Sequence, residues 1–488
     1  MISFDDLLPL LPLLITTVSV VLTMLAISVR RSFIVSAAIT IIGLLIATIV
    51  ALRMLPYTDQ QITPLFIIDQ YSLVFTVVSC SIALFIGILS FPYFFRLDDQ
   101  KEEFYLLLGL ATIGAIVMVS SNHFIGMILG VETLSMSLYG MIAYPLHSKN
   151  AAKNPLEASI KYLILSAAAS GFILFGIALV YMQTGTLEFS ELQFGNTEVL
   201  LSEGYTVLAL MLIVSGISFK LSLAPFHMWT PDVYEGAPLP ATAYLATIGK
   251  MAMFVVFLRF ISISSALSFG SVLAAFSFVA IASIVIGNLL ALMQQNLKRL
   301  LAYSSIAHMG YLMIAVVASF TDDNTLSIEA ISFYLIAYVV MSLGAFAVLS
   351  VVSSSENEFD SVSNFQGLFW RSPWLAAIFT AMLLSLAGIP LTVGFIGKFY
   401  IFASAVESSL WVLLVALVVG SGIGLYYYLR VIYTMLLPKI GESEAFPVAG
   451  IESLSSYVIL GILFVALIFL GVYPAPLMNL LEAASNLI

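Results

Sequence analysis

Apolar runs of helical length follow one another along this chain from residue 8 almost to its end. A helix needs about 20 apolar residues to cross the hydrocarbon core of a bilayer. Backbone in that core must satisfy its own hydrogen bonds, which favours helices over open strands. Only 9% of the 488 residues are charged and 61% are hydrophobic, whereas a soluble domain carries about 25% charged residues. The sequence therefore predicts an all-α polytopic membrane protein without a separate soluble domain.

The length rule predicts about fourteen transmembrane helices. They are expected at 8–29, 33–53, 70–95, 103–120, 122–145, 155–184, 205–236 (broken), 239–262, 268–294, 299–320, 326–353, 373–405 (broken), 408–436 and 453–474. The N-terminus, MISFDDLLPL, has two acids and no Lys or Arg before the first apolar run. It lacks the basic region of a cleaved signal peptide, so we interpret this run as a retained first helix.

Several classes of chemistry are excluded by residue content. The single cysteine, Cys80, rules out a disulfide framework and a Cys-ligated iron–sulfur cluster within this chain. The net charge is −10 and no basic patch suggests nucleic acid. No nucleotide-binding loop, metal-ligand cluster or nucleophile elbow is present.

The basic residues predict the orientation. Ten of the seventeen fall in loops on one side: Arg30, Arg31, Arg96, Lys101, Lys149, Lys153, Lys298, Arg299, Arg371 and Lys439. By the positive-inside rule these loops are cytoplasmic, so an even number of helices places both termini outside. Four other lysines lie within predicted helices: Lys161, Lys220, Lys250 and Lys398.

Two of the predicted helices share an unusual pattern. The string LSLA occurs at 221–224 and again at 384–387, followed by Pro225 and Pro390. Proline removes a helical hydrogen bond and breaks the ladder. The copies are 163 residues apart (384 minus 221), which corresponds to five helices, so the second runs through the membrane in the opposite direction. Broken helices at corresponding positions of inverted halves indicate an ion site in transporters.

The repeat divides the single membrane domain, 1–488, into four parts. These are helices 1–3 (about 1–100), a first repeat of helices 4–8 (about 103–262), a second inverted repeat of helices 9–13 (about 268–438), and helix 14 with its tail (about 450–488).

Charged side chains inside a membrane are functional candidates by default, because each costs about 2.5–3.5 kcal/mol at the bilayer centre. Glu132 lies near the middle of the fifth predicted helix and Lys220 in the seventh. A pair ~4 Å apart would attract by ~4 kcal/mol at an effective dielectric of ~20. That is comparable with the ~2.3 kcal/mol needed to move one charge across 100 mV. The alternative is a protonated Glu132 bonded to a neighbouring helix.

Lys161 and His227 carry two interpretations each. Lys161 follows Glu157 by one helical turn, which suits either a proton relay or a plain salt bridge at a helix end. His227 lies beside Pro225, where it either relays protons near neutral pH or satisfies the carbonyl groups that the proline frees.

Three further residues complete the candidate proton relay. Lys250 has no acid within four residues, so burial would favour its neutral form and a role as proton acceptor; snorkelling to an interface is the alternative. His308 follows Tyr303, Ser304 and Ser305, hydroxyl residues that either hold water or bond a core histidine. Lys398 follows the break at Pro390 and is our candidate for the far end of the path.

Four strings in this chain carry a family resemblance: GVETLSMSLYGM, SFKLSLAPFHMWTPDVYEGAP, LLAYSSIAHMGY and LAGIPLTVGFIGKFY. Together they resemble the antiporter-like membrane subunits of bacterial respiratory complex I, the proton-pumping NADH:quinone oxidoreductase. The resemblance covers nearly the whole chain. It implies two inverted five-helix repeats with helices 7 and 12 broken. By motif match Glu132 and Lys220 form a coupling pair, Lys161, His227 and Lys250 a central relay, and Lys398 a terminal site.

The predicted function is thus one proton-translocating channel of a redox-driven complex in the bacterial inner membrane, with periplasmic termini. The resemblance implies no cofactor in this chain, with FMN, iron–sulfur clusters, NADH and quinone in partner subunits, and an adjacent antiporter-like subunit as neighbour. Two alternatives stay open: a subunit of a secondary cation/proton antiporter without redox partners, and a structural anchor whose buried charges only staple helices together.

Overall fold

The computed structural model describes residues 8–56, 60–95, 97, 100–144, 154–192, 203–263, 270–320, 325–355, 358–438 and 454–485. Among these residues, twelve helices are long and apolar enough to cross a membrane, and two shorter apolar helices, Glu103–Val119 and Pro373–Ala387, accompany them. The predicted all-α class is confirmed, and each of the fourteen predicted segments coincides with a helix, twelve of them long enough to span.

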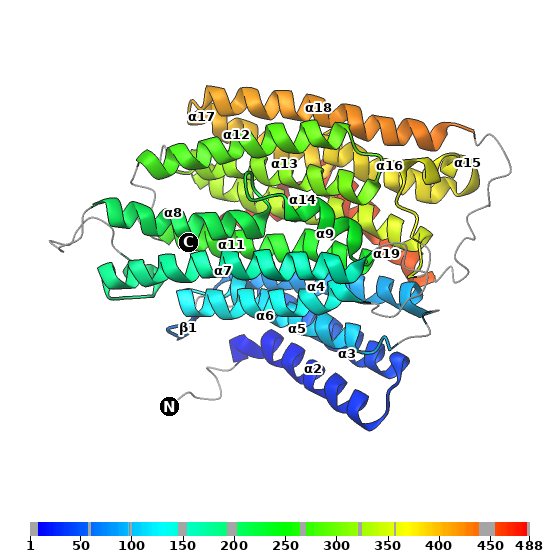
Figure 1. Cartoon of the computed structure of the whole chain (residues 1–488), viewed down its shortest axis with the longest axis horizontal. Coiled ribbons are helices and arrows are strands. Elements are labelled where there is room, and N and C mark those ends of the chain that lie inside the picture. The colour runs from blue at the N-terminus through cyan, green and yellow to red at the C-terminus, as the bar shows by residue number, and fades with distance from the viewer. Residues whose placement is uncertain are drawn as a thin grey trace.

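The helices lie side by side with their axes along one direction (Figure 1). Their bounds are η1 (Leu8–Leu10), α2 (Leu11–Val29), α3 (Phe33–Met54), α4 (Gln70–Phe95), α5 (Glu103–Val119), α6 (Phe124–Ala143), α7 (Pro155–Thr184), η2 (Phe189–Glu191), α8 (Glu203–Leu221), α9 (Trp229–Gly236), α10 (Leu239–Tyr244), η3 (Leu245–Gly249), α11 (Lys250–Ile263), α12 (Gly270–Leu292), α13 (Leu297–Ala318), α14 (Thr325–Val352), η5 (Val362–Phe365), α15 (Leu368–Arg371), α16 (Pro373–Ala387), α17 (Val393–Glu407), α18 (Trp411–Leu436), α19 (Leu454–Val472) and α20 (Ala475–Ser485).

The only strands in the described part of the chain form a small antiparallel hairpin, β1 (Gln60–Thr63) and β2 (Phe66–Ile68), between α3 and α4. It lies at the end of the bundle where α8 begins, and the backbone of Ile67 donates a hydrogen bond to the Ser120 carbonyl at the end of α5. The hairpin was not predicted, because its strands are only four and three residues long.

The centre of the bundle is formed by α13 and α14. The apolar window of α13 is 100% buried and that of α14 is 89% buried, whereas the corresponding windows of α2, α18 and α19 are no more than 33% buried. The outer helices present large apolar side chains such as Val412 and Val465 to their surroundings. A polar residue in the fully buried window of α13 is therefore enclosed by protein.

Two helices are broken, as predicted, in the middle of their course. The first break separates α8 from α9, and the second separates α16 from α17. In Figure 1, α8 enters the bundle from the left and α16 from the right. Pro225 and Pro390 lie in the breaks, where a missing N–H and a fixed φ prevent the helix from continuing.

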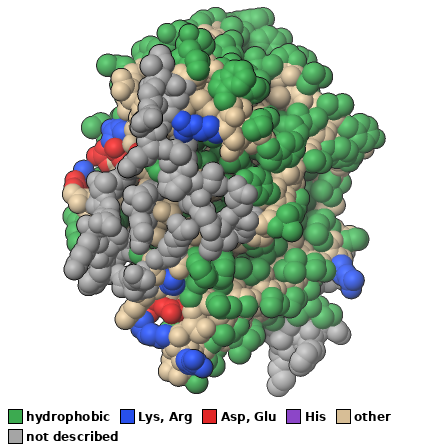
Figure 2. Space-filling model, turned by 90° about the vertical axis from the view of Figure 1, so that its right-hand side faces the viewer, with side chains coloured by type: hydrophobic (Ala, Val, Ile, Leu, Met, Phe, Trp, Pro, Cys, Tyr) green, Lys and Arg blue, Asp and Glu red, His purple; other side chains and the backbone are tan. Residues whose placement is uncertain are grey.

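The ends of the bundle differ from its sides. Figure 2 looks onto the end at which α9, α13 and α15 lie, and basic and acidic side chains are visible there beside extensive apolar surface. Lys298 was expected in a loop at this end. The structure corrects that expectation, because α13 already begins at Leu297 and the Lys298 side chain is fully buried.

Candidate functional site

Lys220 lies in the last turn of α8, just before the first break. Its ammonium nitrogen is 2.9 Å from Ser135 Oγ on α6 and 2.5 Å from Ser166 Oγ on α7. Ser166 also accepts a hydrogen bond from the Tyr139 hydroxyl at 2.8 Å. The ammonium is thus held by hydroxyl groups, which both accept and donate hydrogen bonds.

Glu132 lies on α6, about one turn before Ser135, and its carboxylate accepts a 2.5 Å hydrogen bond from Ser170 on α7. Both Glu132 and Lys220 are described by the structure, and no ion pair joins them. Serine hydroxyls of the same two helices hold the acid and the base instead. The structure therefore brings the expected pair into one polar cluster without direct contact.

His227 lies in the first break, between α8 and α9, and is 8% exposed. Its Nδ1 atom has no hydrogen-bond partner among the described residues. The backbone around it is irregular, with a cis peptide bond between Ala224 and Pro225 and a positive φ of 63° at Ser222. Pro225 and Met228 are exposed on the outside of the bundle.

Lys250 is the first residue of α11 and follows directly on the π-helical turn η3. It is 1% exposed, and its ammonium nitrogen is 2.5 Å from Ser305 Oγ on α13. Ser305 also accepts a hydrogen bond from the Tyr338 hydroxyl of α14 at 2.7 Å. No acidic side chain pairs with Lys250 in the described part of the chain. π-turns occur often at functional sites, and this one sets the direction of the lysine.

His308 is one turn beyond Ser305 on α13 and is fully enclosed. Its Nδ1 is 2.6 Å from the Tyr334 hydroxyl, and its Nε2 is 3.4 Å from the Tyr428 hydroxyl. Tyr428 is in turn hydrogen-bonded to Ser304. Both ring nitrogens of the histidine therefore have hydroxyl partners, an arrangement that suits proton exchange through either nitrogen.

Lys398 lies on α17, after the second break. Its ammonium donates hydrogen bonds to the carbonyl oxygens of Leu386 and Ala387, at 3.0 and 2.9 Å, which are the last carbonyls of α16. The nitrogen also lies 5.2 Å from the centre of the Tyr311 ring. The ring of His308 is 5.6 Å from that same tyrosine ring. Tyr311 thus stands between the histidine and the terminal lysine.

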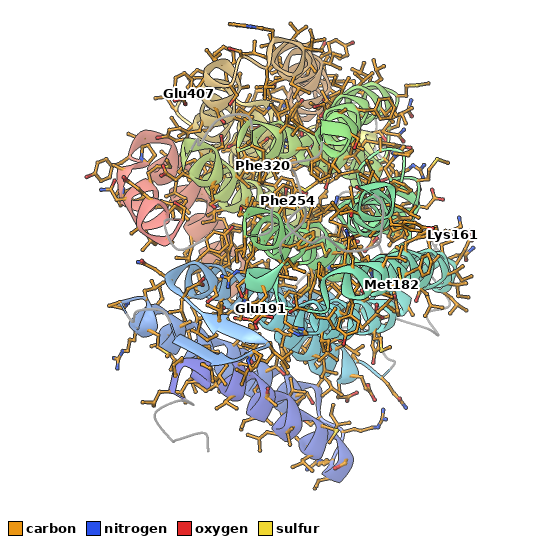
Figure 3. All side chains as sticks on the ribbon, turned by 90° about the vertical axis from the view of Figure 1, so that its left-hand side faces the viewer. Lys161, Met182, Glu191, Phe254, Phe320 and Glu407 are labelled. Atoms are coloured by element: carbon orange, nitrogen blue, oxygen red, sulfur yellow. The ribbon has the colours of Figure 1, made fainter. Side chains whose placement is uncertain are left out.

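Lys161 lies apart from these buried groups. Figure 3 shows it at the rim of the bundle on α7, and its side chain is 44% exposed. It pairs with Glu157 at 2.9 Å and with Asp232 of α9 at 3.2 Å. Asp232 also accepts from Arg299 of α13, which bridges to Glu235 as well, both at 2.8 Å. These charges surround a polar pocket of about 250 Å³.

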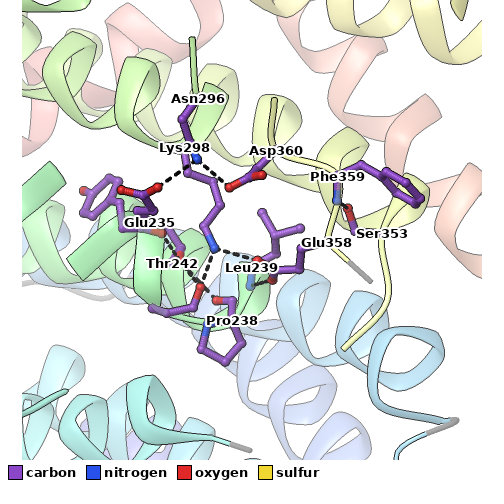
Figure 4. A network of polar contacts seen from close by, with 12 residues as sticks. Glu235, Pro238, Leu239, Thr242, Asn296, Lys298, Ser353, Glu358, Phe359 and Asp360 are labelled. Atoms are coloured by element: carbon purple, nitrogen blue, oxygen red, sulfur yellow. Dashed lines mark hydrogen bonds and ion pairs between the residues drawn. The ribbon is translucent and has the colours of Figure 1, made fainter. Parts of the chain in front are cut away.

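A second charged network at the same end was not predicted (Figure 4). Lys298 donates to the Ala237 carbonyl at 2.5 Å and pairs with Glu358 at 2.8 Å. The Glu358 carboxylate also accepts from the backbone N–H of Leu239 and from the Tyr93 hydroxyl. The network ties the end of α9 and the start of α10 to α13 and α4. A glutamate after α14 and a lysine at the start of α13 gave no local signal in the sequence.

A buried ion pair at the opposite end was also missed. Arg259 on α11 donates from Nη2 to both carboxylate oxygens of Asp69 at 2.8 Å, and both side chains are at most 3% exposed. The ring of Tyr71 lies 5.8 Å from the guanidinium carbon. An arginine inside an apolar run requires such a partner, but its partner is 190 residues away.

We refer to six of the candidate residues as the row: Glu132, Lys220, His227, Lys250, His308 and Lys398. Glu132 and Lys220 are half-buried, and the other four are buried. Serine and tyrosine hydroxyls contact four of these six residues, Glu132, Lys220, Lys250 and His308. Lysines without carboxylate partners in such a row can accept and release protons, and hydroxyls can pass them on.

The fold and the row together define a class: antiporter-like membrane proteins with two broken helices and a buried line of lysines. A family model described as NADH:quinone oxidoreductase/Mrp antiporter, TM, matches residues 121–424. The chain belongs to this family.

Relatives with known names support this assignment. The NADH-quinone oxidoreductase subunit N of Methylococcus capsulatus is 45% identical over 99% of this chain and 95% of its own length. The subunit N of Ectopseudomonas mendocina is 43% identical over 99% of this chain and 97% of its own.

Solved structures show the same fold. A chain of respiratory complex I from Thermus thermophilus aligns with a TM-score of 0.82 at 32% identity, covering 97% of this chain and all of that one. A chain of the Mrp complex from Dietzia aligns with a TM-score of 0.85 at 18% identity, covering 99% of this chain and 97% of that one. The second similarity concerns the fold alone.

Proposed function

We propose that this chain is the proton-translocating subunit N of a bacterial NADH:quinone oxidoreductase. The observation that carries the proposal is the row of buried lysines, whose ammonium groups contact hydroxyls, carbonyls and aromatic rings but no carboxylate among the described residues. Burying three cations is costly, and a purely structural role would pair them. Their retention inside a fold shared with complex I supports proton transfer along the row.

In this proposal Glu132 and Lys220 form one end of the row, and the distance between this acid and this base changes during transport. Their shared serine cluster lets the acid and base approach or separate by side-chain rotation, because Ser135 and Glu132 are on one helix and Ser166 and Ser170 on another. His227, Lys250 and His308 lead on from there, and Lys398 is the terminal site. Lys161 is assigned to the entrance of the relay. Its exposed ammonium lies among carboxylates that line a pocket open to water.

The energy for transport comes from partner subunits in this proposal. No group of three or more His, Cys, Asp or Glu side chains among the described residues is arranged to hold a metal ion. The proposal assigns FMN, iron–sulfur clusters, NADH and quinone to other subunits, as the resemblance to complex I implies. The proposal assigns the chain to the inner membrane with both termini in the periplasm, because basic loops favour a cytoplasmic location for the end that carries Arg299.

The exposed breaks support an assembly with neighbours in the membrane. Irregular backbone at membrane depth is tolerated where protein or a water-filled cavity covers it. Met228 in the first break is 76% exposed and Leu391 in the second is 72% exposed. Adjacent membrane subunits, including another antiporter-like one, would cover these positions.

The test is proton pumping by the assembled complex in closed vesicles, driven by NADH and followed with a pH-sensitive dye. Lys220→Ala and Glu132→Ala are each expected to lower pumping at least about tenfold, which corresponds to about 1.4 kcal/mol or more. Arg53→Ala, which removes an exposed cation of α3 outside the row, is the control. Wild-type pumping in both row variants would remove them from the coupling mechanism, and sodium exchange by the chain without redox partners would favour a secondary antiporter.

A further inference from the structure

Buried polar atoms without a hydrogen-bond partner gather in one short stretch between Lys220 and Lys250. Within the described residues, this stretch contains Ser222 Oγ, His227 Nδ1, Thr230 Oγ1 and the Tyr234 hydroxyl. More than 90% of buried polar groups in folded proteins have a partner, so each exception calls for an explanation. Four exceptions in thirteen residues coincide with the break and with α9, the short half-helix that follows it.

The hydroxyl network of the row is interrupted at this same place. On one side, Lys220 contacts Ser166, which binds the Tyr139 hydroxyl. On the other side, Lys250 contacts Ser305 and its partner Tyr338. No described hydrogen bond joins these two clusters, so a proton that reaches the first cluster requires a further group to reach the second.

Tyr234 stands between the two clusters. It is fully buried on α9, and the Lys250 nitrogen lies 5.7 Å from the centre of its ring. On the Lys220 side, α9 begins at Trp229, whose ring is 4.8 Å from that of Tyr162. The ring of Tyr162 is in turn 5.3 Å from that of Tyr139, which belongs to the first cluster.

We propose that the Tyr234 hydroxyl is the proton-carrying link between the Lys220 cluster and the Lys250 cluster. A proton arriving from the Tyr162 side forms a new O–H bond on the Tyr234 oxygen. The original O–H bond breaks toward Ser305, and the proton passes on to the Lys250 amine. The tyrosine ends as it began, with one O–H bond and no net charge, so no other reactant is consumed.

The other three unpaired groups fit this role less well. Only Tyr234 among them contacts a lysine of the row within the described structure. Ser222 and His227 belong to the break itself, where Pro225 and Met228 are exposed on the outside of the bundle. Thr230 lies one turn earlier on α9, and no hydrogen bond between it and Lys250 is among the described contacts.

The inference rests on the proposed function, and Tyr234→Phe tests it. The substitution removes one oxygen and leaves the buried ring in place. Tyr71→Phe is the matched control, because Tyr71 is also a fully buried tyrosine whose hydroxyl has no partner among the described residues, and it lies on α4 away from the row. Both variants are measured in the complete complex, as NADH oxidation in uncoupled vesicles and as proton pumping in coupled ones.

We expect Tyr234→Phe to lower the ratio of protons pumped to NADH oxidised at least threefold with the complex assembled, and Tyr71→Phe to leave that ratio unchanged. Tyr234→His, which restores a group that donates and accepts, should recover part of the ratio. Wild-type pumping by Tyr234→Phe beside an inactive Lys220→Ala would overturn this inference alone. Wild-type pumping by Lys220→Ala as well would overturn the proposed function.

Discussion

The two broken helices end in the same backbone motif but hold their lysines in different ways. In α8 the N–H of Leu223 bonds the Ser218 carbonyl and the N–H of Ser222 bonds that of Phe219. In α16 the corresponding bonds run from Ile389 to Leu384 and from Gly388 to Ser385. Each pair is a Schellman motif with one residue of positive φ, Ser222 in the first and Gly388 in the second.

This correspondence changes the register of the repeat. The positive-φ residues are 166 residues apart (388 minus 222), whereas the LSLA strings are 163 apart. The LSLA strings therefore do not occupy equivalent positions, although each lies at a break. In the structural register Lys220 corresponds to Leu386, and it is the Leu386 carbonyl that the Lys398 ammonium contacts.

Both ammonium groups thus lie at the carboxyl end of a half-helix, where the partial charge of the helix is negative. Lys220 belongs to the helix that ends there, and its partners are serine hydroxyls of α6 and α7. Lys398 reaches that point from the far side of its break, and its partners are carbonyls, which only accept. The first site suits proton exchange with its surroundings, while the second suits retention of a positive charge at the end of the row.

The largest difference between the two sites is expected when each lysine becomes Met. Lys398→Met deprives two buried carbonyls of a donor, at a cost of about 1–3 kcal/mol each. Lys220→Met leaves Ser166 with its hydrogen bond from the Tyr139 hydroxyl. Both variants should lose pumping, but only Lys398→Met should lower the amount of assembled complex and its thermal midpoint. Equal losses of assembly would show that the carbonyl contacts do not distinguish the sites.

Substitutions at the two residues of positive φ, Gly388 and Ser222, compare how tightly the two breaks are packed. Gly388 has φ 89°, and an added Cβ would lie 2.9 Å from Cδ of Lys398. Gly388→Ala should therefore cost about 1–2 kcal/mol in strain and displace the lysine. Ser222→Gly relieves left-handed strain and loses some backbone entropy, so its effect should be within about 1 kcal/mol of zero. Thermal unfolding and pumping of the two assembled variants measure this, and a stable, fully active Gly388→Ala would contradict the proposed tightness of the second site.

The smallest effect concerns the half-helices beyond the breaks. The eight-residue α9 is tied to α13 by Arg299, which bridges Asp232 and Glu235, whereas α17 has fifteen residues. Partly exposed ion pairs contribute about 0.2–1 kcal/mol. Arg299→Gln should thus reduce pumping by roughly twofold, more at low salt. Lys161→Gln, which removes the more exposed cation of the same cluster, is the reference and should have the weaker effect.

Much of the fold follows from the sequence, because hydrophobic length and proline are local signals. The fourteen segments and both breaks could be placed from them. The exact start of the first break could not, since Ser222 adopts a conformation that serine seldom takes and three residues separate it from Pro225. The burial of Lys298 was missed because its partner Glu358 lies 60 residues further on.

The charged members of the candidate site could be named from the sequence, whereas the contacts between them could not. Glu132, Lys220, Lys250 and Lys398 stand out in apolar surroundings. The serines and tyrosines that contact them do not, because such residues occur throughout membrane helices. Tyr234 in particular has the sequence pattern of an ordinary aromatic residue at a helix end. Only its burial and its position beside Lys250, seen in the structure, distinguish it from other tyrosines.

The π-helical turn Leu245–Gly249 limits the insertions and deletions that this chain can accept in evolution. One additional residue in a helix rotates everything after it by about 100° relative to what precedes it. Lys250 and Arg259 both follow the turn on α11, so one insertion sets the direction of the buried lysine and of the arginine that pairs with Asp69. Loss of a single residue there would misdirect both at once, and no point substitution could restore them. The length of this stretch should therefore tolerate far less variation than its side chains.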